Sequence, residues 1–110
     1  MAVISIDAGT TGIRAFVVDR GGAPVARAYR EFAQHFPRPG WVEHDAEEIY
    51  RNTCAAISGL MQRNTTLEAD VLCLSITNQR ETTVVWNRRT GEPVYNAIVW
   101  QDRRAEPTCA

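Results

Sequence analysis

The first third of the chain carries short apolar blocks separated by turn residues, a pattern typical of β-strands. Residues 3–6 and 13–18 are rich in β-branched and other apolar side chains, and a turn with two glycines separates them. Residues 19–22 give a second turn signal, Asp-Arg-Gly-Gly, and residues 25–32 form a third such block. The pattern predicts an antiparallel meander of three strands.

The spacing of apolar residues changes to a helical period after an irregular segment. Residues 33–44 contain two prolines and a glycine without any period, so we expect a surface connection there. Asp45 is a favourable N-cap, and Glu48 stands in the capping-box position. The helix is predicted to reach Gln62 or Arg63. Its apolar face is predicted to consist of Ile49, Thr53, Ala56, Ile57 and Leu60.

A second group of predicted strands follows the helix. Residues 71–76 are almost continuously apolar, as expected of a strand covered on both faces, and a right-handed crossover would place it parallel to the meander. Residues 82–86 and 94–100, on either side of a turn at 88–91, predict a β-hairpin extension. Residues 101–110 have the polar composition of a beginning helix. Together these elements predict one α/β unit.

Composition limits the classes of function. A chain of 110 residues, 45% hydrophobic and 23% charged, is expected to form about one small globular domain. Twelve basic and thirteen acidic residues give a net charge of −1, which argues against nucleic acid or an acidic membrane as a partner. The three cysteines lack Cys-x-x-Cys spacing, and the chain has no basic apolar leader. We therefore expect reduced thiols and a cytoplasmic location.

The turn between the first two predicted strands carries the most specific chemistry. Asp7 ends the first strand, and a Gly-Thr-Thr-Gly turn follows it. Glycine lets backbone N–H groups approach phosphate oxygens, threonine adds a hydroxyl donor, and Asp7 offers an oxygen to a divalent cation on those phosphates. Arg14 is placed to add a charge-assisted contact. The structural alternative is an ordinary tight turn that needs glycine for a positive φ.

Four segments of the chain together resemble a known family. Asp7-Ala8-Gly9-Thr10-Thr11 is similar to the first phosphate motif of the actin-like, ribonuclease-H-like ATPases, and the sequence lacks the glycine motifs of P-loop and dinucleotide-binding proteins. The stretches PGWVEHD (39–45), TNQRETTVVW (77–86) and YNAIVWQDRR (95–104) resemble the glycerol kinases of the FGGY group of carbohydrate kinases. The resemblance implies an incomplete ribonuclease-H-like (actin-like ATPase) α/β fold, in which residues 1–110 form the N-terminal part of the first kinase domain.

The resemblance also implies cofactors and residue roles. The expected cofactors are ATP and Mg²⁺, with Asp7 acting on the metal ion. The residues expected to contact the nucleotide phosphates are Thr10, Thr11, Gly12 and Arg14. Glycerol hydroxyls are expected to bind Arg80 and Glu81, because an arginine beside a glutamate offers fixed donors next to fixed acceptors. Trp100 is expected to cover the carbon backbone of glycerol.

Simpler interpretations exist for several of these side chains. On spacing alone, Arg80 and Glu81 form an exposed, solvated pair of little energetic weight. The other aromatic residues considered are predicted to be core or cover residues: Trp41, Trp86, Tyr29 and Tyr95. The two histidines, His35 and His44, lack metal-ligand spacing and are predicted to lie at the surface. Arg103 and Arg104 either begin an exposed helix or belong to the family motif.

The resemblance implies that the general base and a second, nucleotide-clamping domain lie beyond residue 110. The chain alone is therefore expected to have no catalytic residue and no kinase activity, while a complete protein would phosphorylate glycerol to glycerol 3-phosphate and could form a homo-oligomer. Without the further βα units, apolar surface is expected to be exposed. The alternatives are a related FGGY sugar or polyol kinase and a non-catalytic, actin-like binding module.

Overall fold

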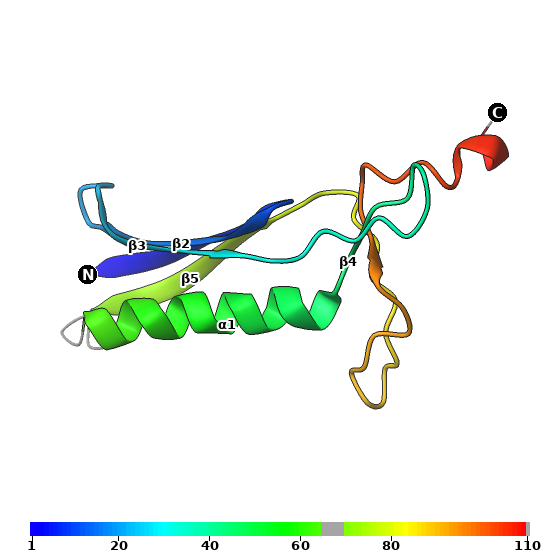
Figure 1. The fold of residues 1–110 in the computed structure, drawn as a ribbon. Helices are drawn as coiled ribbons and strands as arrows, with labels where there is room; N and C mark the ends of the chain where they lie inside the picture. The colour runs from blue at the N-terminus through cyan, green and yellow to red at the C-terminus, as the bar shows by residue number, and fades with distance from the viewer. Residues whose placement is uncertain (65–69, 110) are drawn as a thin grey trace.

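Four strands form one sheet in the order β3-β2-β1-β5, in a computed structural model that describes residues 1–64 and 70–109 (Figure 1). The strands β1 (Ala2–Ala8), β2 (Gly12–Asp19) and β3 (Pro24–Glu31) are antiparallel neighbours. The strand β5 (Val71–Asn78) lies parallel to β1 on its other side. The predicted meander and the predicted parallel strand are both confirmed.

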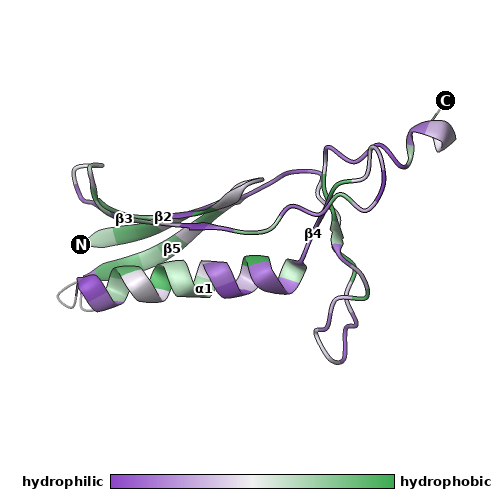
Figure 2. Ribbon diagram, in the orientation of Figure 1, coloured by the Kyte–Doolittle hydropathy of each residue, from purple (hydrophilic) through white to green (hydrophobic). Residues whose placement is uncertain are grey.

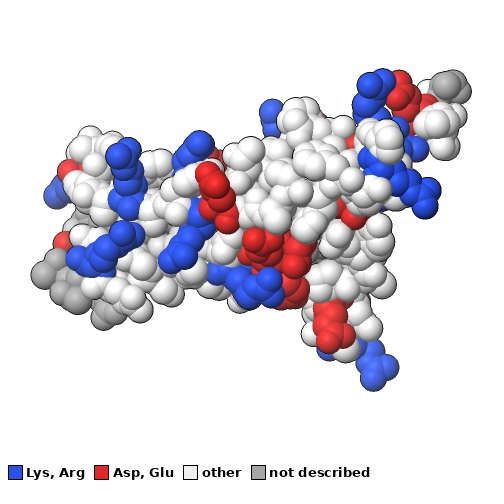
Figure 3. Space-filling model, in the orientation of Figure 1, with Lys and Arg blue, Asp and Glu red and all other residues white. Residues whose placement is uncertain are grey.

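One helix, α1 (Ala46–Arg63), lies beneath the sheet, as Figure 1 shows. Its N-cap is Asp45, as predicted, and the Asp45 carboxylate accepts hydrogen bonds from the backbone N–H groups of Glu47 and Glu48 at 2.9 and 3.2 Å. The Glu48 carboxylate accepts from the backbone N–H of Ala33 instead of completing a capping box. Acidic groups gather at the start of α1 (Figure 3), where they complement the helix dipole.

The hydrophobic core lies between α1 and one face of β1, β2 and β3. Alternate residues of β1 and β2 point toward the helix because successive side chains of a strand face opposite sides. Each fully buried Ile or Leu contributes about 1.5–3 kcal/mol relative to exposure. The buried core residues are Ala2, Ile4, Ile6, Ile13, Ala15, Val17, Phe32, Ala56 and Leu60.

The apolar strand β5 is exposed, so the prediction that it is covered on both faces is wrong for this chain. The parallel register pairs Ile4 with Leu74 and Ile6 with Ile76, which places these β5 side chains on the α1 side of the sheet. The helix lies mainly over β2 and β3, on the side of the sheet away from the β5 edge. Leu74 is 45% exposed and Ile76 is 61% exposed. The expectation of exposed apolar surface is therefore confirmed. Figure 2 shows the hydrophobic colouring of β5.

An extension built from short pairings follows the sheet. The two-residue strands β4 (Glu43–His44) and β6 (Ala97–Ile98) pair with each other. Single bridges, Thr83 to Ile98 and Trp86 to Pro93, form the predicted hairpin without the continuous strands expected at 82–86 and 94–100. Trp86, Tyr29 and Tyr95 are exposed and Trp41 is half-buried, so the first three are not core residues.

The described end of the chain forms one 3₁₀ turn, η2 (Glu106–Thr108), in place of the helix predicted for 101–110. Hydrogen bonds from the backbone N–H and the side chain of Arg104 to Asp102 hold residues 102–104 in a bend, and Pro107 cannot donate a helical hydrogen bond. Ala110 lies outside the described residues. No helix in 1–64 or 70–109 is long and apolar enough to cross a bilayer.

Candidate functional site

The predicted phosphate turn connects β1 to β2 at the closed end of their hairpin. The backbone N–H of Gly9 donates to the Gly12 carbonyl at 3.0 Å and closes the turn. Asp7 and Arg14 are register partners across the two strands, and Arg14 Nη1 lies 3.4 Å from Asp7 Oδ2. Both side chains remain well exposed. The structure thus brings a carboxylate and a guanidinium together beside the turn, with both accessible from solvent.

Crowding, not backbone conformation, explains the glycine at position 12. In the described residues, the glycines with positive φ are Gly22, Gly40 and Gly91, so the alternative that the turn needs glycine for a positive φ is wrong. A Cβ at Gly12 would lie 2.6 Å from the Arg30 carbonyl oxygen and 2.7 Å from the Tyr29 ring. Glycine is therefore required by the close approach of β3.

The donor set at this turn fits a divalent cation that is carried by phosphates. Within residues 1–64 and 70–109, no three His, Cys, Asp or Glu side chains gather to hold a metal ion. Mg²⁺ is commonly bound by one or two carboxylates together with phosphates and waters, so a dedicated protein cage is not needed. Asp7 can supply the single carboxylate, while Arg14 carries charge complementary to phosphate.

The predicted polyol residues follow β5 and only one of them touches the phosphate turn. Arg80 and Glu81 are exposed, and Glu81 has φ +63°, a left-handed conformation that is uncommon for a residue with a side chain. The Trp100 indole N–H donates to Thr10 Oγ1 at 3.1 Å. The structure therefore joins Trp100 to Thr10, whereas Arg80 and Glu81 take part in none of the side-chain hydrogen bonds found among the described residues.

His44 is fully buried, so the prediction that it lies at the surface is wrong. Its ring makes an edge contact with Phe32, with ring centroids 4.8 Å apart. Its Nε2 lies 2.6 Å from Gln34 Oε1, and its Nδ1 lies 3.3 Å from Gln79 Nε2. Burial lowers the pKa of His44, the charge of His35 lowers it further, and Glu48 opposes the shift. The ring is consequently held neutral between two amide side chains.

A buried ion cluster fixes the segment that carries Trp100. Arg104 Nη2 donates to Glu43 Oε1 at 2.7 Å and to Asp102 Oδ2 at 2.8 Å, and its Nε donates to Asp102 Oδ1 at 2.8 Å. The guanidinium also lies 3.8 Å from the centre of the Trp41 ring, a favourable cation–π distance. Arg104 is therefore a largely buried residue, and the exposed-helix interpretation is wrong for it; Arg103, 70% exposed, remains at the surface.

The charges in this cluster are stabilised by hydrogen bonds. Burial would raise the pKa of Glu43, but hydrogen bonds from Arg104, Asn96 and Tyr95 bring that pKa below its usual value. Hydrogen bonds from Arg104 lower the pKa of Asp102 to about 2. The cluster thus remains ionised at neutral pH. Sequence reasoning missed these partners and the amides around His44, because no local pattern signals a contact between segments as far apart as Glu43 and Arg104 or His44 and Gln79.

A pocket of about 540 Å³ lies between α1 and the β3 edge of the sheet, and no residue of the ion cluster lines it. Of the predicted site residues, it is lined only by Arg14. The predicted phosphate and polyol residues instead lie on an open surface beside the extension.

Comparison with known proteins identifies the family of this chain. The N-terminal domain model of the FGGY family of carbohydrate kinases matches residues 2–110. A glycerol kinase of Acidovorax ebreus is 55% identical over 108 residues, 98% of this chain and 22% of that protein. The chain therefore spans about a fifth of the length of such relatives.

Solved structures show the same fold. The Plasmodium falciparum glycerol kinase with ADP is 38% identical with a TM-score of 0.83, over 97% of this chain and 22% of that one. The xylulose kinase of Rhodospirillum rubrum is 28% identical with a TM-score of 0.85, over 97% and 22% respectively. The predicted fold class and kinase family are confirmed, and the chain belongs to the FGGY family of carbohydrate kinases, matching its N-terminal domain.

Proposed function

We propose that this chain forms the phosphate-binding wall and one wall of the polyol site of a glycerol kinase, which transfers the γ-phosphate of ATP to glycerol in the cytoplasm. The hydrogen bond between Trp100 and Thr10 carries this proposal. It joins a residue expected to cover glycerol to a residue expected to hold phosphate. Phosphoryl transfer requires the acceptor oxygen about 3–3.5 Å from the phosphorus, so the two substrates must share such a boundary.

Each residue of the proposed site has a role that fits its surroundings. Asp7 provides the carboxylate for Mg²⁺, which when bound neutralises phosphate charge. Arg14 pairs with phosphate oxygens. Its guanidinium already lies 3.4 Å from Asp7, the proposed metal ligand, so Arg14 needs little movement to reach phosphates that carry the metal ion. The residues proposed to line the phosphates besides Arg14 are Thr10, Thr11 and Gly12. Arg80 and Glu81 are free to offer donors and acceptors to glycerol hydroxyls.

The chain by itself is proposed to be inactive. The Asp45 carboxylate caps α1, and Asp102 is ion-paired with a pKa of about 2, so neither suits the role of general base. The base and the second half of the nucleotide site are proposed to come from a further part of a complete kinase. Homo-oligomer formation is likewise proposed only for such a protein.

A related FGGY sugar or polyol kinase is the second candidate, because the xylulose kinase of Rhodospirillum rubrum shares the fold at 28% identity. The identity of 55% to a glycerol kinase favours glycerol. A non-catalytic binding module would leave Arg80, Glu81 and Trp100 without a substrate.

A hybrid kinase tests the proposal. In it, this chain replaces the matching segment of the Acidovorax ebreus glycerol kinase. We expect glycerol-dependent ADP release from the hybrid and none from the 110-residue chain alone. Arg80→Ala should raise the KM for glycerol more than the KM for ATP, whereas Arg88→Ala, at an exposed turn, should change neither. An inactive hybrid, turnover by the isolated chain, or a preference for xylulose would contradict the proposal.

A further inference from the structure

A closed circuit of hydrogen bonds surrounds the phosphate turn and passes through His44. Gln34 Nε2 donates to the Thr10 carbonyl at 3.0 Å, and Gln34 Oε1 accepts from His44 Nε2. On the other side of the ring, Gln79 Nε2 donates to His44 Nδ1 and lies 3.4 Å from the Gly9 carbonyl. The circuit therefore reaches two successive carbonyls of the turn from opposite sides of one imidazole.

The circuit continues into the segment expected to hold the polyol. The Thr82 hydroxyl donates to Gln79 Oε1 at 2.9 Å and accepts from the Trp100 backbone N–H at 3.3 Å. The Trp100 indole then donates back to Thr10 Oγ1 at 3.1 Å. Arg80 and Glu81 lie in the sequence between Gln79 and Thr82, so the circuit fixes both ends of the short stretch that presents them.

Backbone groups determine the directions of the hydrogen bonds on both sides of the His44 ring. A carbonyl only accepts, so the NH₂ group of Gln34 must face Thr10 and its oxygen must face His44. The NH₂ group of Gln79 faces Gly9, which leaves its oxygen to accept from Thr82. His44 must therefore donate from Nε2 and accept at Nδ1, which is one neutral tautomer. A protonated ring would set an N–H against the NH₂ group of Gln79.

We propose that His44 is a positioning residue that holds the phosphate turn and the 79–82 segment at a fixed separation for phosphoryl transfer. The inference rests on the proposed function, since it assigns these two segments to the two substrates. His44 reaches the phosphate turn through Gln34, and it reaches Arg80 and Glu81 through Gln79 at the start of the 79–82 segment. Its burial and its contact with Phe32 prevent the ring from following a loosened turn, so the separation is set by the core.

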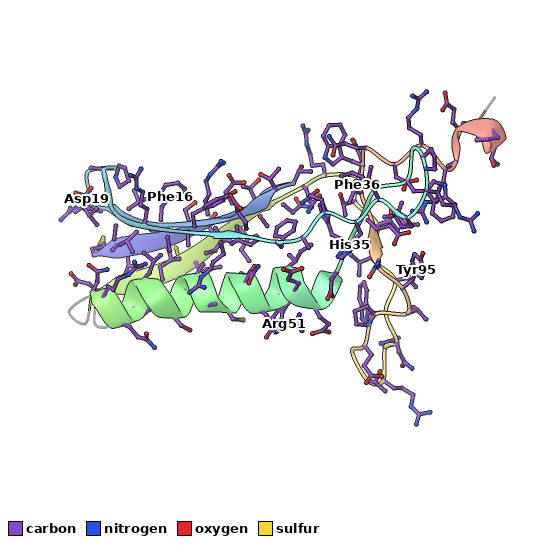
Figure 4. The ribbon with its side chains drawn as sticks, in the orientation of Figure 1. Phe16, Asp19, His35, Phe36, Arg51 and Tyr95 are labelled. Atoms are coloured by element: carbon purple, nitrogen blue, oxygen red, sulfur yellow. The ribbon has the colours of Figure 1, made fainter. Side chains whose placement is uncertain are left out.

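Turnover of the hybrid kinase tests the role of His44. His44→Phe keeps a ring of similar size but removes both hydrogen bonds, and we expect kcat to fall by roughly 10–100-fold with smaller changes in either KM. His44→Asn retains an acceptor near Nδ1 and His44→Gln retains a donor near Nε2, so each should restore part of the loss. The matched control is His35→Phe, because His35 (labelled in Figure 4) forms a backbone bridge to Glu43, next to His44, while its side chain lies outside the circuit.

Hydrogen–deuterium exchange of the same hybrids gives a readout that does not need catalysis. We expect His44→Phe to increase exchange in residues 7–12 and 78–83 together, with α1 unchanged, and His35→Phe to leave both segments as they were. A general rise across α1, no change in either segment, or a kcat equal to that of His35→Phe would overturn the proposal. If the unsubstituted hybrid is inactive while the two segments still respond together, the linkage by His44 stands and the proposed function fails.

Discussion

Replacement of Arg104 with alanine is the most informative single perturbation of this fold. The guanidinium serves two carboxylates at once, Glu43 and Asp102, whose side chains are each only 2% exposed. It also covers one face of Trp41. No other basic group is hydrogen-bonded to either carboxylate among the described residues. The substitution therefore leaves two buried negative charges without a counter-charge.

The expected magnitude follows from what each carboxylate retains. Removing one partner of a buried ion pair typically costs about 3–5 kcal/mol. Glu43 keeps hydrogen bonds from Tyr95 and Asn96, whereas Asp102 keeps only backbone N–H donors, from Val42 and position 104. We expect a loss of about 4–5 kcal/mol, in the upper part of that range. Arg104→Lys should fall in between, since one ammonium keeps the charge but not the bidentate geometry.

Urea unfolding of the hybrid kinase, followed by tryptophan fluorescence, measures the effect. Arg103→Ala is the matched control, because Arg103 is 70% exposed and pairs only with the exposed Glu106, so its midpoint should not change measurably. Adding Asp102→Asn to Arg104→Ala should cost less than the sum of the single changes, because it removes one unpaired charge. Equal midpoints for the Arg103 and Arg104 variants would refute the assignment of a buried ion cluster.

Three further predictions concern the turn, acid stability and the exposed strand. Gly12→Ala should destabilise by about 1–3 kcal/mol because its Cβ would lie 2.6 Å from a carbonyl oxygen, whereas Gly59→Ala, with its nearest neighbour at 3.7 Å, should stabilise α1 by about 0.5–1 kcal/mol; thermal unfolding separates them. Acid should lower the urea midpoint in two pH ranges, because the folded-state pKa values of His44 and Asp102 both lie below the unfolded ones. The stability contributed by His44 is lost as the pH falls below 6.5, and that contributed by Asp102 is lost as the pH falls from 3.8 toward 2. His44→Phe should abolish the first loss and Asp102→Asn the second. The isolated chain should bind a hydrophobic dye and self-associate in sedimentation experiments, and Leu74→Ser with Ile76→Ser should reduce both; a dye-free monomer would contradict this.

The sequence predicted the elements whose signals are local. Short apolar blocks and Gly-containing turns located the meander, and Asp45 located the start of α1. The apolar run at 71–76 was correctly assigned to a parallel strand, but its burial was not, since an edge position depends on which other elements are present to cover it. A local pattern predicts which face of a segment is apolar. It does not predict which other elements pack against that face.

The candidate site was predicted only where a contiguous motif carries it. The Asp7 turn and Trp100 were identified through such motifs, and the structure adds the hydrogen bond that joins Trp100 to Thr10. His44 was predicted to lie at the surface, and an exposed helix was one of two interpretations of Arg104, because histidine and arginine are mostly not fully buried. Each is buried with partners from distant parts of the chain, Gln79 for His44 and Glu43 for Arg104. Pairings of this kind have no signature in spacing.

The two-residue strand β4 links the ion cluster to the circuit around the phosphate turn. Its residues are adjacent and their side chains point to opposite sides, Glu43 toward Arg104 and His44 toward Gln34 and Gln79. Trp100 is consequently fixed by two routes, one through the Arg104 cluster at 102–104 and one through Thr82. Because both routes meet at β4, a change at Arg104 that leaves the hybrid folded should also displace His44. We therefore expect stability and turnover to be coupled at these two positions, and independent at Arg103 and His35.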